Sequence, residues 1–272
     1  MSAFADITAT AGSTGNRVTN AIAMASRRTG VDFSYLLGQA KIESSLNPTA
    51  RAATSSATGL YQFIDQSWLA VVDKHGSEYG LSWASDAISQ GSNGRYYVAD
   101  PQLRQQILDL RKHPETASVM AAEHAADNKA YLEQKLGRDA EPVDLYLAHF
   151  LGVGGASKFL SVHDRAPDAS AASLFPAAAR ANRSIFYDRQ GNARSFSEIR
   201  DRFASKLQKG VQSLGGDIQY ASAALPDGVK TVQPADYVRI ETQRLAAQPD
   251  IMVAPQPQTA RLAYLMLATL GR

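Results

Sequence analysis

KIESSLNPTARAATSSATGLYQF, residues 41–63, places one carboxylate at the end of an apolar helical pattern and follows it with a polar, turn-rich loop. Upstream, apolar residues recur every three to four positions and predict an amphipathic helix over residues 33–46. Asp32 is typical of its N-cap, and Pro48 is expected to end it, because the residue before a proline is displaced from helical conformations. Glu43 would then lie beside the apolar face of this helix.

The whole chain has the composition of a soluble globular protein. Its 272 residues are 44% hydrophobic and 20% charged, which is enough to bury a sizeable core. Alanine-rich segments with helical spacing dominate, and alternating strand-like runs are scarce, so we expect a mainly α fold. Changes in composition divide the chain into a flexible N-terminal segment (1–16), a main domain (17–210), and a linker with a partly helical C-terminal extension (211–272).

Charge and residue usage exclude several classes of protein. The net charge of +2 is too small for a nucleic-acid-binding surface of clustered basic residues. The chain has no cysteine, so it forms no disulfides and no cysteine-metal sites. No apolar run reaches the length of a membrane span, and the first residues show no ordinary secretion signal.

Helix-start residues predict further helices in the main domain. N-capping residues and prolines at first helical positions mark these starts. The starts lie at Asp65 or Ser67, at Asp100-Pro101, at Pro114 and at Ser195. The helix from Pro114 is expected to stop at Gly137, and Ser195 with Glu198 forms a capping box.

Glu43 is the candidate for acid-base chemistry. A carboxylic acid against apolar side chains loses hydration when ionised, so we expect a raised pKa and proton donation near neutral pH. Most glycosidases need a second carboxylate. Asp65 is better explained as a helix cap, and Asp73 and Glu78 as solvated charges. A single acid suffices if the sugar supplies its own nucleophile.

A third segment, DLYLAHFLGVGGASKFL (144–160), carries polar side chains on an apolar helix. Tyr146, His149 and Phe150 share one face before a glycine-rich stretch interrupts the helix. A lone histidine in such a place is either a satisfied core residue or a functional group. No spacing typical of metal ligands occurs, and we predict no metal site and no cofactor.

Taken in order, ESSLNP (43–48), GLYQF (59–63) and YLAHFLGVGGA (146–156) resemble the motifs of soluble lytic transglycosylases, with the goose-type lysozyme fold as a wider relative. The resemblance covers residues 17–205 and implies a lysozyme-like catalytic domain. It also implies a catalytic acid/base and a set of substrate-binding residues. The acid/base is Glu43, and the binding residues are Ser44, Gly59, Leu60, Tyr61, Gln62, Phe63, Tyr146 and His149.

The third motif departs from the family pattern Ala-Tyr-Asn-x-Gly. Ala148-His149-Phe150-Leu151-Gly152 occupies its place, so the family tyrosine near the glutamate is missing. Either His149 or Tyr146, one turn earlier, is expected to replace it as a hydrogen-bond partner of Glu43. A neutral imidazole suits proton donation better than a charged one.

The resemblance implies cleavage of the β-1,4 bond between MurNAc and GlcNAc in peptidoglycan, with a 1,6-anhydromuramoyl product, in the periplasm or cell envelope. Two alternatives stay open. One is a muramidase that uses water. The other is a weakly active protein that binds or assembles cell wall for a flagellar or secretion system. The apolar C-terminal segment (250–272) is expected either to dock on a protein of such a flagellar or secretion system or to pack on the chain's own domain.

Overall fold

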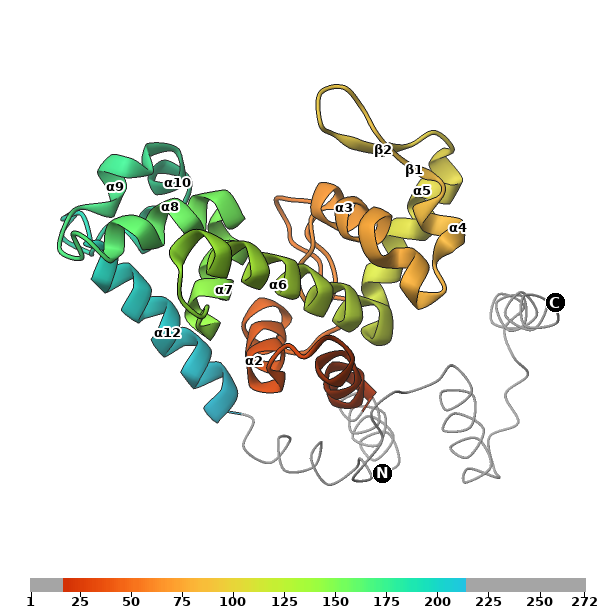
Figure 1. Cartoon of the computed structure of the whole chain (residues 1–272), viewed down its shortest axis with the longest axis horizontal. Helices are drawn as coiled ribbons and strands as arrows, with labels where there is room; N and C mark the ends of the chain where they lie inside the picture. Colours follow the sequence, from red (N-terminus) through yellow and green to blue (C-terminus); the bar gives the residue numbers. More distant parts are fainter. Residues whose placement is uncertain (1–16, 214–272) are drawn as a thin grey trace, which may run out of the picture. The chain divides into compact units, whose positions relative to one another are not determined.

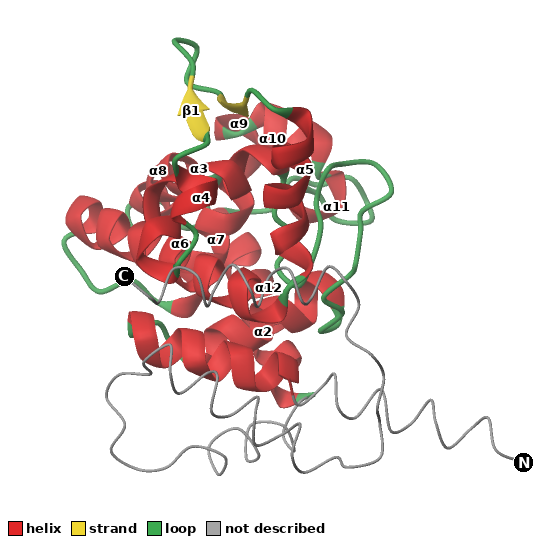
Figure 2. Cartoon of the chain, turned by 90° about the vertical axis from the view of Figure 1, so that its right-hand side faces the viewer, coloured by secondary structure: helices red, strands yellow, loops and turns green. Residues whose placement is uncertain are grey.

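The computed structural model describes residues 17–213, and these are mainly helical, as predicted (Figures 1 and 2). The expectations for residues 1–16 and 214–272, the C-terminal extension included, lie outside the described residues. Within 17–213, no helix has the length and apolar character needed to cross a membrane.

Residues 17–29 are helical, and named elements follow. The longer helices are α2 (Phe33–Ser44), α3 (Asp65–His75), α5 (Pro101–Asp109), α6 (Pro114–Leu136), α7 (Pro142–Leu151), α8 (Val153–His163) and α12 (Phe196–Gln212). The short ones are η1 (Gly76–Tyr79), α4 (Ser82–Ser85), η2 (Leu110–Lys112), α9 (Ala171–Leu174), α10 (Pro176–Ala181) and α11 (Arg183–Phe186). Strands β1 (Ile88–Gln90) and β2 (Tyr96–Val98) form an antiparallel hairpin in which Ser89 pairs with Tyr97.

Helix α6 is the central element of the domain (Figure 1). It packs against α2, α3, α7 and α8. Its contact positions are largely alanine, including the buried Ala117, Ala121 and Ala125. Small side chains let neighbouring helices approach closely, and α6 can therefore contact several helices at once.

Helix α12 closes the domain by packing along α2 and α7. Four apolar side chains that share one face of this helix, Phe196, Ile199, Phe203 and Leu207, are all buried. The predicted capping box is present too: Ser195 accepts from the backbone N–H of Glu198, whose carboxylate accepts from the Ser195 N–H. These contacts bring α12 together with both α2 and α7.

Several other helix ends follow the sequence signals. Asp32 accepts a hydrogen bond from the Tyr35 N–H at 2.7 Å, as an N-cap does. Asp100 caps α5, with Pro101 at its first position. Helix α6 ends at Gly137, which has the left-handed conformation (φ +69°) expected of a C-terminal glycine.

Two helix-end predictions were wrong. Helix α2 ends at Ser44, before Pro48 can act, because Ser45 and Leu46 turn left-handed and the Ser45 N–H bonds to the Lys41 carbonyl. Neither Asp65 nor Ser67 caps α3, whose N-cap is Ile64 with no side-chain bond. The predicted interruption by the glycine-rich stretch is present: it falls at Gly152, between α7 and α8, while the next two glycines lie inside α8.

The hairpin projects beyond the helices in both views of the fold (Figures 1 and 2). The side-chain amide of Gln66 fixes it to α3, donating to the Tyr96 carbonyl and accepting from the Tyr96 N–H, each at 2.9 Å. The amide thus bonds to the backbone of β2 as a neighbouring strand would. Tyr97, next along β2, is 52% exposed.

Candidate active site

Glu43 lies in the last turn of α2, where side chains from α7 and α12 approach it. Its Oε1 accepts a hydrogen bond from the Tyr146 hydroxyl at 3.0 Å. His149 Nε2 lies 3.5 Å from the same oxygen. The Glu43 side chain is 20% exposed, so it is partly shielded yet reachable from solvent.

Tyr146 and His149 therefore both contact Glu43. Tyr146 is one helical turn before His149, and their rings stack with centroids 6.0 Å apart. The sequence left open which of the two contacts Glu43, and the structure brings both of them to it. Burial first, and then the nearby Glu43, raise the pKa of the Tyr146 hydroxyl, which keeps it protonated as a donor.

Lys206 on α12 is a member of this cluster that sequence reasoning missed. Its Nζ donates to the Tyr146 hydroxyl at 3.2 Å and lies 5.6 Å from the centre of the Tyr146 ring. Nothing near Lys206 in the sequence indicates this position. It follows from the packing of α12 against α7, which brings together residues 60 positions apart.

The expectation of a raised pKa for Glu43 is wrong for this structure. Burial does raise the pKa of the carboxyl, and it is the largest single influence. Contact with His149, the hydrogen bond from Tyr146 and the charge of Lys206 together outweigh it, so the net pKa is lowered. The carboxylate is thus the favoured form in the protein without a ligand.

The loop between α2 and α3 is held by backbone contacts that use Gly59 and Gln62. Gly59 has φ +85°, and a Cβ there would lie 2.0 Å from the carbonyl oxygen of Arg111. Gln62 also has a positive φ (49°), and its Nε2 donates to the carbonyls of Ala50 and Gly59. Both residues have a structural use in the loop; their role in binding a substrate stays a prediction.

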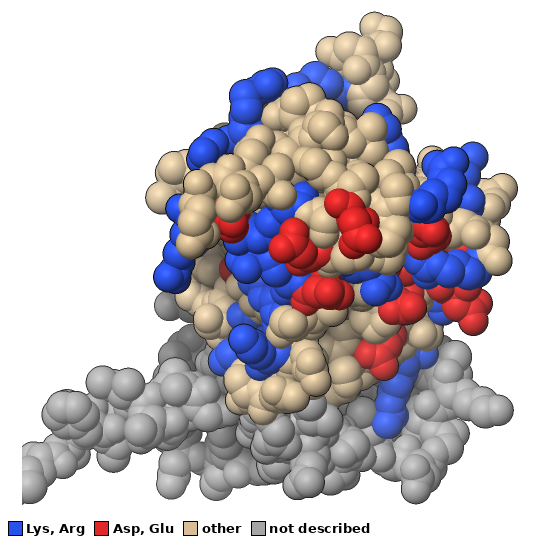
Figure 3. All heavy atoms as spheres, turned by 90° about the vertical axis from the view of Figure 1, so that its left-hand side faces the viewer, with Lys and Arg blue, Asp and Glu red and all other residues tan. Residues whose placement is uncertain are grey.

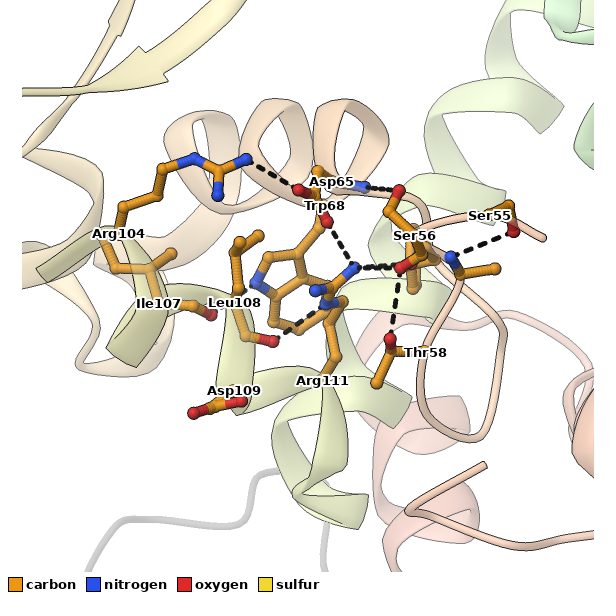
Figure 4. A network of polar contacts seen from close by, with 12 residues as sticks. Ser55, Ser56, Thr58, Asp65, Trp68, Arg104, Ile107, Leu108, Asp109 and Arg111 are labelled. Atoms are coloured by element: carbon orange, nitrogen blue, oxygen red, sulfur yellow. Dashed lines mark hydrogen bonds and ion pairs between the residues drawn. The ribbon is translucent and has the colours of Figure 1, made fainter. Parts of the chain in front are cut away.

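Arg111 fastens the end of this loop to η2 (Figure 4). The side chain is 7% exposed and its Nη1 donates to the carbonyls of Ser56 and Phe63, each at 2.9 Å. The same nitrogen lies 3.0 Å from the carboxylate of Asp65, which also binds Arg104 at 2.7 Å. Asp65 is therefore an ion-pair partner of two arginines rather than a helix cap.

The other predicted site residues lie as follows. Leu60 and Tyr61 are at most 1% exposed, backbone included, and pack in the core; their role in binding a substrate stays a prediction. The Ser44 hydroxyl donates to the Ala40 carbonyl of its own helix at 3.0 Å. Phe63 packs edge-on against His124, with ring centroids 5.9 Å apart, and lines a small pocket.

Several residues that line this pocket were not predicted as site residues from the sequence. His149 and Phe63 line it together with Gln39, His124 and Asn128, three residues outside every predicted site. Their spacing offers a weak signal in hindsight. Gln39 precedes Glu43 by one turn of α2, and His124 and Asn128 are one turn apart on α6, so each pair shares a helix face.

Burial and a neighbouring charge act on His124 in the same direction. Burial in the first place, and then the charge of His149, lower the pKa of His124 to about 4. In the structure it is a neutral imidazole on the wall of the pocket, next to the group that contacts Glu43.

The surface carries charges of both signs. On the face shown in Figure 3, Asp and Glu side chains lie among Lys and Arg side chains. The charges on this face are therefore mixed in sign. Among the described residues, Arg200 binds Glu141 at 2.7 Å and the buried Asp144 at 3.2 Å.

Among residues 17–213, no three His, Asp or Glu side chains converge in a way that could ligate a metal ion. No protein-family model matches the chain.

Proposed function

We propose that the protein is a peptidoglycan lytic transglycosylase with a lysozyme-like catalytic domain, cleaving the β-1,4 bond between MurNAc and GlcNAc. The observation that carries the proposal is the Glu43 carboxylate, 20% exposed at the end of α2 and oriented by the Tyr146 hydroxyl at 3.0 Å. A carboxyl group that is both fixed and accessible can meet a glycosidic oxygen and transfer a proton. The ordered resemblance in residues 43–48, 59–63 and 146–156 points to the same chemistry.

The proposed reaction needs one carboxyl group. Protonated Glu43 gives its proton to the O4 oxygen of GlcNAc as the bond from that oxygen to C1 of MurNAc breaks. The Glu43 carboxylate then takes the proton of the MurNAc C6 hydroxyl, whose oxygen bonds to C1. The products are a free 4-hydroxyl and a 1,6-anhydromuramoyl end, and no water, metal or cofactor takes part.

The lowered pKa of Glu43 fits the second step directly, because a carboxylate is the base. The first step requires the protonated form. A glycan bound over the site displaces water from a side chain that is already largely buried, and lost hydration raises the pKa of a carboxyl group. Binding of the substrate thus supplies the shift that the free protein lacks.

Digestion of purified peptidoglycan followed by mass spectrometry tests the proposal. Anhydro ends are one water lighter than reducing ends, and we expect anhydro ends. The Glu43→Gln variant keeps the shape of the side chain and should lose at least about 100-fold in rate, because it cannot transfer the proton. Glu78→Gln is the control, since the Glu78 side chain is 61% exposed and pairs with His75 rather than with the cluster.

Three results would contradict the proposal. Activity of Glu43→Gln within tenfold of the unmodified protein would exclude Glu43 as the proton donor. Reducing ends would indicate a hydrolytic muramidase. Binding of the polymer with no cleavage would indicate a cell-wall-binding or assembly protein.

A further inference from the structure

Lys206 is an exposed lysine on α12 whose ammonium group contacts the cluster formed by Glu43, Tyr146 and His149. Its Nζ donates to the Tyr146 hydroxyl at 3.2 Å and lies 5.6 Å from the centre of the Tyr146 ring. Among the described residues, no carboxylate forms an ion pair with it. Tyr146 is therefore the group that fixes the position of its side chain.

A close crossing of α2 and α12 determines where this lysine lies. A Cβ added at Gly210 would lie 3.3 Å from the carbonyl oxygen of Gly38, and one added at Gly38 would lie 3.0 Å from Val211. The helices can approach this closely because neither glycine has a side chain. Gly210 follows Lys206 by four residues and shares its face of α12, so the crossing holds Lys206 beside α2.

Hydrogen-bond chemistry gives the contacts from Lys206 to Glu43 a direction. An ammonium group only donates, whereas a tyrosine hydroxyl has one proton to donate and lone pairs that accept. Lys206 occupies an acceptor position of the Tyr146 hydroxyl and cannot take its proton. The proton of the hydroxyl is therefore directed to Glu43 Oε1, 3.0 Å away, where it favours the ionised carboxyl group.

The titratable side chains that act on Glu43 come from three helices. They are Tyr35 on α2, Tyr146 and His149 on α7, and Lys206 on α12. Burial, the largest influence, raises the pKa of the Glu43 carboxyl, and the positive charge of Lys206 is among the influences that lower it. Lys206 thus acts on Glu43 both through its charge and through the hydroxyl that it orients.

We propose that Lys206 is a positioning residue for proton donation by Glu43: it orients the Tyr146 hydroxyl and stabilises the negative charge that develops on the carboxyl group as the proton leaves. The inference rests on the proposed function and deepens it, because it assigns control of the acid to a residue of α12. An interaction that strengthens as charge develops lowers the barrier of the step, whereas one that is equal before and after the step lowers only KM. The effect of Lys206 therefore falls on kcat.

Lys206→Met removes the ammonium group and keeps an unbranched side chain. With a soluble glycan chain of alternating GlcNAc and MurNAc as substrate, kcat below the pKa of the complex should fall about tenfold, while KM stays within about twofold. The pH profile of kcat/KM gives a second readout. Glu43 must be protonated to donate, so kcat/KM falls as the pH rises through its pKa. Loss of Lys206 raises this pKa, and the fall should move to higher pH.

The Tyr146→Phe background tests whether Lys206 acts through the hydroxyl. In this background, Lys206→Met should lower kcat by less than about threefold, because two residues that act through one hydrogen bond are not additive. Lys209→Met is the matched control. Lys209 is also exposed and lies three residues further along α12, so its removal takes the same charge from the helix and should leave kcat and the pH profile unchanged.

A kcat of Lys206→Met within about twofold of that of the unmodified protein would overturn the proposal. A lower kcat with an unchanged pH profile would also overturn it, because a structural role predicts that result. An equal loss with and without the Tyr146 hydroxyl would exclude the route through Tyr146.

Failure of the proposed function is distinguishable from failure of this inference. If the protein cleaves no glycan, the pKa of Glu43 is measured by NMR titration of its carboxyl carbon in the full-length Lys206→Met variant. A raised pKa would support the coupling of Lys206 to Glu43, and an unchanged pKa would overturn it.

Discussion

The hydroxyl of Tyr146 donates to Glu43 Oε1 across 3.0 Å and links α7 to the end of α2. Lys206 donates in turn to the same hydroxyl from α12, so three helices meet at one oxygen atom. A hydrogen bond to the ionised form of a carboxyl group favours that form. The tyrosine is therefore a determinant of the protonation state of Glu43.

Tyr146→Phe should raise the pKa of Glu43, because it removes a donor to the carboxylate and leaves the burial in place. The pKa can be followed by NMR titration of the Glu43 carboxyl carbon in the full-length protein. Tyr131→Phe is the control, since Tyr131 is 37% exposed and contacts Lys135 rather than Glu43. A pKa that stays constant or falls in Tyr146→Phe would show that His149 and Lys206 alone set it.

The lowered pKa of Glu43 also predicts a pH dependence of stability. The folded pKa lies below the unfolded one, so the unfolded state binds more protons in acid and stability falls as the pH falls. The contribution is complete above the unfolded pKa of about 4.3 and is lost as the pH drops through the folded pKa. Between about pH 5 and pH 3, the unmodified protein should lose free energy of unfolding relative to Glu43→Gln, which does not titrate there.

Urea denaturation of both proteins at several pH values gives this difference. It isolates Glu43 because every other titratable group is common to the two proteins. A difference that grows in favour of the unmodified protein with decreasing pH would mean that the Glu43 pKa is raised on folding.

Helix starts were predicted correctly wherever the capping partner is close along the chain. Asp32, Asp100 and Ser195 each bond to a backbone N–H within three residues, so their role can be seen in a short window. The prediction that Asp65 is a helix cap was wrong. Its partner Arg111 is 46 residues away, and an ion pair at that separation is set by the packing of η2 against the loop.

In the candidate site, too, residues with local signals were predicted and residues that depend on distant contacts were missed. Glu43 was identifiable because a carboxylate at a helix end next to a turn-rich loop is a local pattern. Lys206, Gln39 and Asn128 were not, since each becomes part of the site only when α12 or α6 is placed beside α2. The predicted rise in the pKa of Glu43 was wrong for the same reason. Burial was predicted from neighbours on α2, but the groups that lower the pKa come from α7 and α12.

Arg111→Met should destabilise the protein by about 1 to 3 kcal/mol, the usual cost of leaving buried acceptors without their donor. The substitution leaves Asp65 and the carbonyls of Ser56 and Phe63 without their shared donor. Arg104→Met is the matched control: its side chain is 36% exposed, and a surface pair of this kind contributes up to about 1 kcal/mol. Chemical denaturation measures both, and equal small losses would show that the loop does not depend on Arg111.

Gly59→Ala should be strongly destabilising, for two reasons that can be separated. The first is the positive φ of +85°, which costs a residue with a side chain about 1 to 2 kcal/mol. The second is contact, because the new Cβ would lie 2.0 Å from the Arg111 carbonyl oxygen, which is backbone and must move.

Gly80→Ala isolates the first cost. Gly80 has φ +73°, and a Cβ there would meet nothing within 4 Å. We expect a loss of about 1 kcal/mol for Gly80→Ala and at least about 3 kcal/mol for Gly59→Ala, both measured by chemical denaturation at pH 7. Similar losses in the two variants would mean that the loop and η2 can separate freely. The contact between Gly59 and Arg111 would then have no part in fixing the loop that carries Phe63 to the pocket.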